Sequence, residues 1–410
     1  MKRGLIGERL THSYSCDIHK YLSGKEYSIK ELTFDELGVF MTDKSFEAIN
    51  VTIPYKQGVM KYLDEVNEEA IDINAVNTIA NKGGKLYGYN TDVYGFKFTI
   101  DCYKVSITGK KVIILGDGGA AQAIKYVVGK YNPSSLISVM ARDKEGCITY
   151  DECYLKHEDA DVIINTSPAG MYPNNNISPI DLGKFTKLKC VVDIVYNPLK
   201  TKLIVDAEDR GIQAVGGLMM LVAQAKRAIE IFDDCEIADD KIVEFTEQLT
   251  KMKQNIAFIG MPGSGKSTIA KYLQGYKEYE VVDIDEEIVK ASNCSIEEIF
   301  HTNGEQAFRE VETKCIENIS KRNHQLIACG GGVVKNKVNI DLLRQNSIIV
   351  FIDRDIELLP TDGRPLSKDK NAIKRLYEER IELYHNYCDV IIKNNGTIEQ
   401  LIQTIKGILE

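Results

Sequence analysis

A phosphate-binding loop in the middle of the chain is the feature that most constrains its fold. Residues 260–268 read GMPGSGKST, which fits the pattern G-x-x-x-x-G-K-[ST]. An apolar run at 256–259 precedes the loop and a helix-like run at 269–273 follows it, which is the strand–loop–helix order that such a loop requires. The residues before the loop carry a second glycine signature of another kind. One chain is therefore expected to hold two nucleotide-dependent active sites.

Length and composition indicate a multidomain enzyme that binds neither nucleic acid nor a membrane. The 410 residues exceed one ordinary core, so two or three domains are expected. The net charge of −9 disfavours a broad nucleic-acid-binding surface, and no apolar run approaches the roughly 20 residues of a membrane span. The 10 cysteines form no C-x-x-C pair, which favours a reducing, cytoplasmic setting over a zinc site or a disulfide framework.

Apolar runs alternate with helix-like stretches in both halves of the chain. This alternation predicts α/β domains built on parallel sheets. The predicted strands are 111–115, 135–140, 162–165 and 191–195 in the first half, and 256–259, 325–328 and 347–352 in the second. A predicted helix at 218–232 and a charged, helix-compatible stretch at 233–254 lie between the two sets, so the linker is placed at 246–255.

The first half contains a turn typical of dinucleotide-binding domains. After the strand at 111–115 comes GDGGAA at 116–121, with the spacing G-x-G-x-x-A. The first glycine permits the tight turn, the second lets the backbone approach a pyrophosphate, and a small third residue allows close packing of helix on strand. The helix N-terminus then faces the anion. The predicted cofactor-binding residues of this turn are Gly116, Gly118, Gly119, Ala120 and Ala121.

The residues after the next strand give a mixed signal on the cofactor. The strand is followed by Ala141, Arg142 and Asp143, where the adenosine ribose should lie. An arginine there favours the 2′-phosphate of NADP, whereas an acidic residue favours the free 2′-hydroxyl of NAD. We predict that Arg142 binds the 2′-phosphate and that the cofactor is NADPH, with NADH as the open alternative.

Short segments spread over residues 1–230 occur in an order typical of one enzyme family. They are GLIG at 4–7, HSYS at 12–15, NVTIPYK at 50–56, AVNT at 75–78, GYNTD at 88–92, NTSPAGM at 165–171, YNP at 196–198 and GGLMMLVAQ at 216–224. Together they resemble shikimate dehydrogenase. The resemblance implies a two-domain dehydrogenase, with a shikimate-binding domain at 1–100 that includes a helix near 218–245, and a Rossmann-like NADP-binding domain at 101–217. Asp143 departs from the family, which usually has a hydroxyl residue there.

The resemblance also assigns residues to the reduction of a ketone. It implies that Lys56 and Asp92 are catalytic, since a lysine ammonium can stabilise an oxyanion and deliver a proton, and a carboxylate keeps that lysine charged. The residues that match substrate-binding positions are Ser13, Ser15, Asn50, Thr52, Asn77, Tyr196 and Gln224, and Gly217 matches a cofactor-binding position. From the residues alone, Ser15 could instead cap a helix and Gln224 could be a helix-surface residue.

The phosphate-binding loop predicts roles for its own residues. Its backbone N–H groups surround the phosphates, Lys266 reaches the β- and γ-phosphate oxygens, and the Ser267 hydroxyl helps to hold Mg²⁺. The predicted nucleotide-binding residues are Gly263, Ser264, Gly265, Lys266, Ser267 and Thr268. Further on, residues 281–285 are expected to form a strand that presents Asp283 and Asp285 on one face.

Later segments extend the pattern of the second half. They are GEQAFRE at 304–310, CGGG at 329–332, GRPL at 363–366 and LYEERIELY at 376–384. With the phosphate-binding loop they resemble shikimate kinase across residues 254–410, which implies a P-loop kinase domain at 256–410 that uses ATP and Mg²⁺. The run LLPTDG at 358–363 departs from the family, which often has a basic residue at the start of its lid.

The second resemblance also implies roles. Asp285 would orient the substrate hydroxyl and accept its proton, Asp283 would support Mg²⁺, and Arg364 would come from a lid loop and stabilise charge on the transferring phosphoryl group. The residues that match substrate-binding positions are Arg309, Gly331, Gly332 and Arg380. Two arginines suit the bidentate grip of a carboxylate.

Together the resemblances imply a bifunctional enzyme of chorismate and aromatic amino-acid biosynthesis. The first half would reduce 3-dehydroshikimate to shikimate with NADPH, and the second would phosphorylate shikimate with MgATP. Two alternatives stay open: a quinate/shikimate dehydrogenase that uses NAD, prompted by Asp143, or one half that is a catalytically silent binding module. Association into homo-oligomers is also left open.

Overall fold

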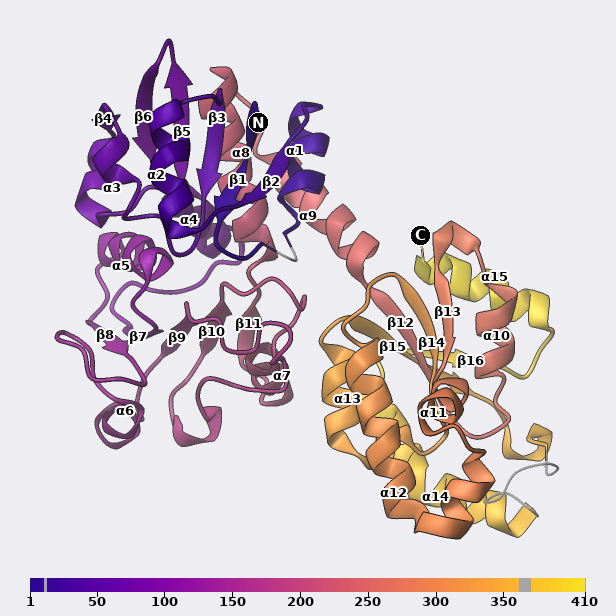
Figure 1. Cartoon of the computed structure of the whole chain (residues 1–410). Helices are drawn as coiled ribbons and strands as arrows, with labels where there is room; N and C mark the ends of the chain where they lie inside the picture. The colour runs from indigo at the N-terminus through magenta and orange to yellow at the C-terminus, as the bar shows by residue number, and fades with distance from the viewer. Residues whose placement is uncertain (11–12, 361–369, 410) are drawn as a thin grey trace. The chain divides into compact units, whose positions relative to one another are not determined.

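The computed structural model describes residues 1–10, 13–360 and 370–409. The chain divides into two compact units, Met1–Leu249 and Thr250–Glu410 (Figure 1). Both units contain a parallel sheet with helical connections, so the predicted α/β class is confirmed. Across the described ranges, no helix has the length and apolarity needed to cross a membrane.

A mixed sheet opens the first unit. Its strands, in the order in which they pair, are β2 (Ser28–Glu31), β1 (Arg3–Gly7), β3 (Ala48–Val51), β5 (Thr78–Lys82), β6 (Lys85–Tyr89) and β4 (Glu65–Val66). The helical elements around it are α1 (Ser15–Ser23), α2 (Phe34–Asp43), η1 (Met60–Tyr62), α3 (Glu68–Ile73) and α4 (Asp92–Cys102). Thr33 and Glu36 form a capping box that starts α2. The apolar face of α2 then packs through Phe40 and Met41 on the sheet residues Ile49 and Ile79.

A parallel sheet follows in the same unit. Its strands, in pairing order, are β11 (Gln213–Val215), β10 (Cys190–Asp193), β9 (Val162–Asn165), β7 (Lys111–Leu115) and β8 (Ser135–Val139). Its helical elements are α5 (Gly119–Lys130), α6 (Tyr150–Lys156), η2 (Leu182–Lys184) and α7 (Lys202–Asp209). Strands β9 and β10 are buried along their whole length, as expected for a sheet covered by helices on both faces. The carboxyl ends of β7, β9 and β10 meet at the edge where the dinucleotide turn lies.

Two helices complete the first unit. Helix α8 (Leu218–Asp233) packs on α1 and α4, and a Cβ on Gly95 of α4 would lie 2.7 Å from the carbonyl oxygen of Met220. Only glycine allows this approach, and it brings α8 back to the mixed sheet's half of the unit. Helix α9 (Asp240–Lys253) buries Ile242, Phe245 and Leu249 in one hydrophobic cluster with residues of α1 and α8. The first unit ends at Leu249, so the last residues of this helix belong to the second unit.

The second unit is built on one parallel sheet. Its strands, in pairing order, are β13 (Glu280–Asp283), β14 (Gln325–Ala328), β12 (Asn255–Ile259), β15 (Ser347–Asp353) and β16 (Val390–Lys393). Its helices are α10 (Lys266–Tyr272), α11 (Ile284–Ser292), α12 (Ile296–Ile319), α13 (Lys337–Arg344), α14 (Lys370–Tyr387) and α15 (Ile398–Leu409), with 3-10 turns η3 (Tyr276–Glu278), η4 (Val333–Lys335) and η5 (Ile356–Leu358). The phosphate-binding loop follows the central strand β12, so it lies at the carboxyl edge of the sheet.

One predicted element of the second unit is wrong. Asp283 is the last residue of β13, and Asp285 lies in the first turn of α11 rather than on the strand. The reason is local, because the Asp283 carboxylate accepts a hydrogen bond of 3.0 Å from the Asp285 N–H and so caps the helix. The two carboxylates therefore do not share a strand face, although they remain at the same edge of the sheet.

Candidate active sites

An ion pair between Lys56 and Asp92 lies at the centre of the first unit's candidate site. Lys56 follows β3 and Asp92 begins α4, and 2.5 Å separates Nζ from Oδ2. The two side chains are only 12% and 8% exposed. The Asn77 amide donates to the other Asp92 oxygen at 2.9 Å, and its own oxygen accepts from the Thr91 N–H at 2.7 Å. This network fixes the lysine, the carboxylate and the amide relative to one another.

The neighbouring polar residues differ in how free they are to meet a ligand. The buried Asn50 amide donates to the Asn77 backbone carbonyl and to the Thr78 hydroxyl, so it holds the Asn77 segment in place. Its oxygen accepts from the Tyr27 hydroxyl, so these groups of Asn50 are already engaged. Thr52 is half-buried at the end of the β3 segment. Gln224 is half-buried on α8, where its amide oxygen accepts from the Thr91 hydroxyl at 3.3 Å. It is therefore part of the network rather than a plain helix-surface residue.

Three further residues predicted to bind substrate bring their hydroxyl groups together. Ser13 donates to Ser15 at 2.9 Å, and Ser13 also hydrogen-bonds Tyr196. Burial raises the pKa of Tyr196 above its ordinary value, so it remains a neutral phenol. The alternative that Ser15 caps a helix is wrong, since Tyr14 occupies the N-cap position of α1 and Ser15 is its first residue. The three residues therefore offer uncharged donors.

The dinucleotide turn has the backbone that a pyrophosphate needs. Gly116 has φ of +105°, and a Cβ there would lie 2.7 Å from the Thr166 hydroxyl oxygen. Gly118 is the N-cap residue of α5, Ala120 follows in its first turn, and the buried Ala121 packs the helix on β7. The N–H groups of this helix start thus face the carboxyl edge of the sheet, where an anion is favoured.

A contact joins this turn to the ion pair. A Cβ on Gly119 would lie 3.2 Å from Cδ of Lys56, so the lysine stem packs against the first turn of α5. The predicted cofactor turn and the predicted catalytic lysine therefore meet within the first unit. Gly217 is explained by packing, because a Cβ there would lie 2.1 Å from the Ile194 carbonyl oxygen. Arg142 is exposed in the loop after β8.

A buried carboxylate supports the loops at this edge. Asp193 ends β10 and accepts hydrogen bonds from the Thr201 hydroxyl at 2.6 Å, the Asn165 amide at 2.9 Å and the Val195 N–H at 3.0 Å. Burial raises the pKa of Asp193 to about 7, although these neutral donors work in the opposite direction. Asp193 thereby ties the loop after β9 to the segment that leads to Tyr196.

In the second unit, the phosphate-binding loop is held by its own lysine. Lys266 begins α10 and its Nζ donates to the carbonyl oxygens of Gly260 and Met261, each at 2.9 Å. Gly263 and Gly265 have φ of +84° and +103°, which lets the loop turn its N–H groups inward. The Ser264 hydroxyl is buried and has no hydrogen-bond partner in the described ranges. The loop therefore fits a set of phosphate oxygens.

Two residues near this loop fit a magnesium ion bound together with a nucleotide. Ser267 is exposed beside Thr268 in the first turn of α10, and Asp283 is half-buried at the end of β13. No group of three or more histidine, cysteine or acidic side chains converges on a metal site in the parts of the chain described. Mg²⁺ commonly keeps several waters and takes only one or two protein ligands beside phosphate oxygens, so this small donor set suits it.

Glycines 330–332 lie among four charged side chains. A Cβ on Gly330 would lie 3.1 Å from an Asp285 oxygen and 3.2 Å from a Glu312 oxygen. A Cβ on Gly332 would lie 2.4 Å from an Arg309 nitrogen. The Gly331 carbonyl accepts from Arg380 at 3.0 Å, and a Cβ on Gly331 would collide with Pro262 of the phosphate-binding loop at 2.7 Å. Predicted base, predicted arginines and nucleotide loop therefore meet around one glycine triplet.

The two arginines are held differently. Arg309 on α12 donates to Glu312 at 2.8 Å and to Glu305 at 3.1 Å. Arg380 on α14 is 2% exposed, and its Nε has no hydrogen-bond partner among the residues described. The same Nε lies 3.8 Å from a Glu379 oxygen, and the planar guanidinium has the paired donors that suit a carboxylate ligand.

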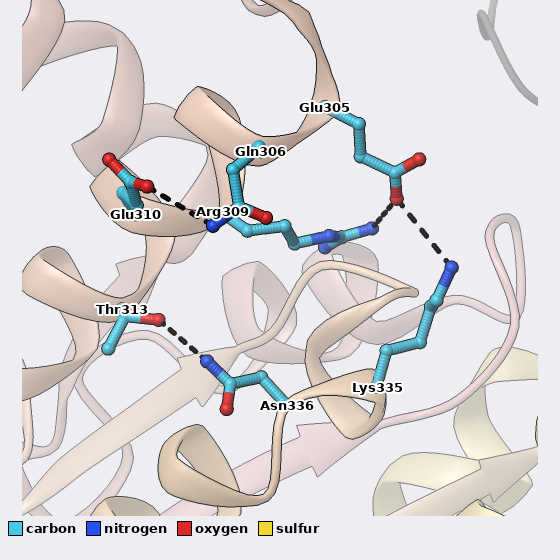
Figure 2. Close-up of a pocket in the computed structure, with 7 residues that line it drawn as sticks. All are labelled: Glu305, Gln306, Arg309, Glu310, Thr313, Lys335 and Asn336. Carbon is cyan, nitrogen blue, oxygen red and sulfur yellow. Dashed lines mark hydrogen bonds and ion pairs between the residues drawn. The ribbon is translucent and has the colours of Figure 1, made fainter.

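A charge network covers the outer side of Arg309. Figure 2 shows Glu305 between Arg309 and Lys335, and Lys335 lies 3.6 Å from Glu305 and 2.9 Å from Glu379, the neighbour of Arg380. Glu305, Arg309 and Lys335 line a pocket, whose other lining residues are Gln306, Glu310, Thr313 and Asn336. The network links α12, η4 and α14 outside the glycine triplet.

Some members of the second site were missed from the sequence, and one predicted member lies outside the described residues. Glu312 is fully buried, and burial raises its pKa while Arg309 lowers it. Its position three residues after Arg309 on a helix was the available signal. Asn394, after β16, donates to the Ser264 carbonyl at 2.7 Å, a contact that no local pattern marks. Arg364 lies in 361–369, outside the described residues.

Comparison with known proteins identifies similar sequences for both units. Residues 5–79 match the family model of the shikimate dehydrogenase substrate binding domain, and residues 262–410 match that of shikimate kinase. Shikimate dehydrogenase (NADP(+)) of Clostridium perfringens (strain SM101 / Type A) is 40% identical over 267 residues, covering 59% of this chain and 94% of the relative.

Solved structures match the first part of the chain. The chorismate mutase/shikimate 5-dehydrogenase fusion protein from Clostridium acetobutylicum has a TM-score of 0.56 and 36% identity, covering 60% of this chain and 96% of that one. Shikimate dehydrogenase 1 from Peptoclostridium difficile has a TM-score of 0.57 and 32% identity, covering 61% of this chain and 98% of that one.

Proposed function

Because the chain belongs to the shikimate dehydrogenase family and carries a shikimate kinase domain in its second unit, we propose that it catalyses two successive reactions. The first is NADPH-dependent reduction of 3-dehydroshikimate to shikimate. The second is MgATP-dependent phosphorylation of the shikimate 3-hydroxyl. The chain is further proposed to act in the cytoplasm on these small molecules.

In the first reaction Lys56 is the proton donor. When bound, NADPH would supply the hydride for the ketone carbon. The Lys56 ammonium would give its proton to the carbonyl oxygen as the carbonyl electrons move there. Asp92, 2.5 Å from Lys56, holds the ammonium in place and orients the substrate hydroxyls together with Asn77. Ser13, Ser15 and Tyr196 hold the substrate carboxylate. The contact between Lys56 and Gly119 carries this assignment, because it sets the proton donor beside the cofactor turn.

In the second reaction Asp285 accepts the proton of the 3-hydroxyl. ATP and Mg²⁺, when bound, supply the phosphoryl group and neutralise its charge. Lys266 and the loop N–H groups hold the phosphates, and Ser267 and Asp283 support the metal. Arg309 and Arg380 grip the substrate carboxylate beside Gly331 and Gly332. Arg364 is proposed to act from the lid.

A two-step assay on the whole chain tests the proposal. We would supply 3-dehydroshikimate with NADPH or NADH, follow loss of the reduced cofactor, then add MgATP and measure shikimate 3-phosphate. Lys56→Met should lower the first rate about 1000-fold and Lys266→Ala the second by about as much, each leaving the other rate unchanged. The exposed neighbours Lys61→Met and Lys271→Ala serve as matched controls. Equal loss of both rates in either variant would refute two independent active sites.

Asp143 favours a second candidate for the first unit. It replaces the hydroxyl residue of the family and would repel a 2′-phosphate, so quinate/shikimate oxidation with NAD is the competing activity. Turnover of quinate with NAD⁺ above that of shikimate with NADP⁺ would establish it. If only one of the two steps runs at all, the other half is a binding module.

A further inference from the structure

An acidic residue occupies the dinucleotide turn itself. Asp117 lies between Gly116 and Gly118, and its side chain is 8% exposed. It forms ion pairs with Lys125 of α5 and with Lys144, and it accepts a hydrogen bond of 2.7 Å from Gln122. Its partners thus come both from the helix that the turn starts and from a different loop.

The charge of Asp117 needs an explanation, because the turn should meet an anion. Like charges close together are destabilising, so a bare carboxylate at this place would oppose pyrophosphate binding. Burial acts to raise the pKa of Asp117, but the ion pairs with Lys125 and Lys144 and the Gln122 amide hold it below its ordinary value. The aspartate therefore stays ionised, and with two lysines the cluster carries a net positive charge.

Lys144 reaches this cluster from the loop that follows β8. Strands β7 and β8 are parallel neighbours, with Leu115 opposite Val139, so their two loops meet at the carboxyl edge of the sheet. In doubly wound folds, the residues after the second strand read the ribose 2′-substituent. Lys144 lies two residues after Arg142, and its side chain is 45% exposed despite the ion pair with Asp117, so the lysine is not sealed from solvent.

We propose that Asp117 positions Lys144, and that Lys144 binds the ribose 2′-phosphate together with Arg142 and so offsets Asp143. The inference rests on the proposed use of NADPH and names the residues that give this chain its preference. Asp117 acts through Lys144 and is a positioning residue. The competing role for Asp117, an acceptor for free ribose hydroxyls, would instead favour NAD.

Direct binding to the whole chain separates the two roles. Titration calorimetry with NADP⁺ and with NAD⁺ would compare the wild type, Lys144→Met, Asp117→Asn and a control, Lys156→Met. Lys156 is an ion-paired lysine on α6 that is 63% exposed and pairs with Glu152. We expect Lys144→Met to weaken NADP⁺ about tenfold and leave NAD⁺ unchanged. Asp117→Asn should also weaken NADP⁺, although it removes a negative charge. The control should change neither.

Two outcomes contradict the inference and leave the proposed function standing, and a third contradicts both. If Asp117→Asn binds NADP⁺ as well as the wild type or better, the positioning role is refuted. A wild type that prefers NADP⁺ while Lys144→Met keeps the same preference refutes the role of Lys144 alone. A wild type that does not discriminate between the two cofactors refutes both this inference and the proposed NADPH preference.

Discussion

The two units are proposed to hold the carboxylate of the same molecule with different donors. The first offers the hydroxyls of Ser13, Ser15 and Tyr196, which bond one another. The second offers the guanidinium groups of Arg309 and Arg380, which need Glu305, Glu312 and the Gly331 carbonyl around them. Burying an unpaired charge costs far more than burying a hydroxyl, so the ionic grip needs more supporting residues.

This difference suits the order of the proposed reactions. A hydroxyl carries no charge, so its bond to the substrate carboxylate lacks the ion-pair attraction and the paired donors that a guanidinium adds. In the proposed sequence, shikimate is the product of the first reaction and the substrate of the second. A site of neutral donors favours its release, and a site of guanidinium groups favours its capture.

Among changes to the residues proposed to bind the carboxylate, the largest effect on KM is expected in the second unit. Arg380→Gln should raise the KM for shikimate in phosphorylation about 10- to 100-fold, because it removes a charged donor from a buried site. Steady-state kinetics at saturating MgATP measure this change. Arg380→Lys keeps the charge but loses the fork of donors, so it should recover only part of the affinity. A proportional rise in the KM for ATP would show instead that the glycine triplet has moved against Pro262.

A smaller effect is expected for the corresponding change in the first unit. Ser13→Ala should raise the KM for 3-dehydroshikimate about 2- to 10-fold, since one uncharged donor to the substrate carboxylate is lost while the others remain. Reduction rates measured across substrate concentrations give this value. Ser23→Ala, at the far end of α1, is the matched control. A rise in KM as large as that expected for Arg380→Gln would show that the hydroxyl groups and the guanidinium groups do not differ in how strongly they bind the carboxylate.

The smallest expected effect is a difference between the two sites in how their KM values depend on salt. Raising the ionic strength from about 0.1 M to about 1 M shortens the Debye length from about 10 Å to about 3 Å. We expect the KM for shikimate in the second unit to rise by at most about threefold, and the KM for 3-dehydroshikimate to change less. Both constants can be measured in one salt series. Equal salt dependence would mean that the hydroxyl site also relies on a nearby charge.

Two buried carboxylates also differ in whether their partners are charged or neutral. Glu312 faces Arg309, whereas the bonds to Asp193 come from neutral donors, and burial raises the pKa of each. For Asp193 the folded pKa of about 7 lies above the ordinary 3.8. The folded state therefore binds more protons than the unfolded state between these values, so this group's contribution to stability falls as the pH rises from about 4 to about 7.

Calorimetric unfolding of the whole chain checks this titration. Asp193→Asn removes it, so the Tm of the first unit's transition in the wild type should fall, relative to the variant, as the pH rises through this window. Asp151→Asn, exposed on α6, gives the baseline. Parallel pH curves for the wild type and Asp193→Asn would show that the carboxyl keeps its charge state on unfolding.

The sequence predicted the parallel sheets because their strands are continuous apolar runs. β7, β9 and β14 occupy the ranges expected from that pattern. It failed at Asp285, because alternation along a strand does not reveal that Asp283 would cap a helix. The prediction extended the strand past Asp283, whose side-chain oxygen satisfies the N–H of Asp285, the second residue of the helix.

Some residues of the candidate sites could be named from the sequence, and some of their contacts could not. The resemblances named Lys56, Asp92, Arg309 and Arg380, and the structure brings each pair together, although their roles stay proposals. The pairing of Asp117 with Lys144 and of Asn394 with Ser264 could not be read from the chain. Such contacts depend on which loops meet at a sheet edge, and that is a property of the fold rather than of spacing.

The contact of Lys56 with Gly119 restricts how the cofactor preference of this enzyme can be engineered. A library that varies the dinucleotide turn would normally treat its third glycine as free to become alanine or serine. Here a Cβ would lie 3.2 Å from Cδ of Lys56, so the stem of the proposed proton donor would have to move by a few tenths of an ångström. Asp117 and Arg142 can be varied without that cost, so successful designs should concentrate at these two positions and leave 119 untouched.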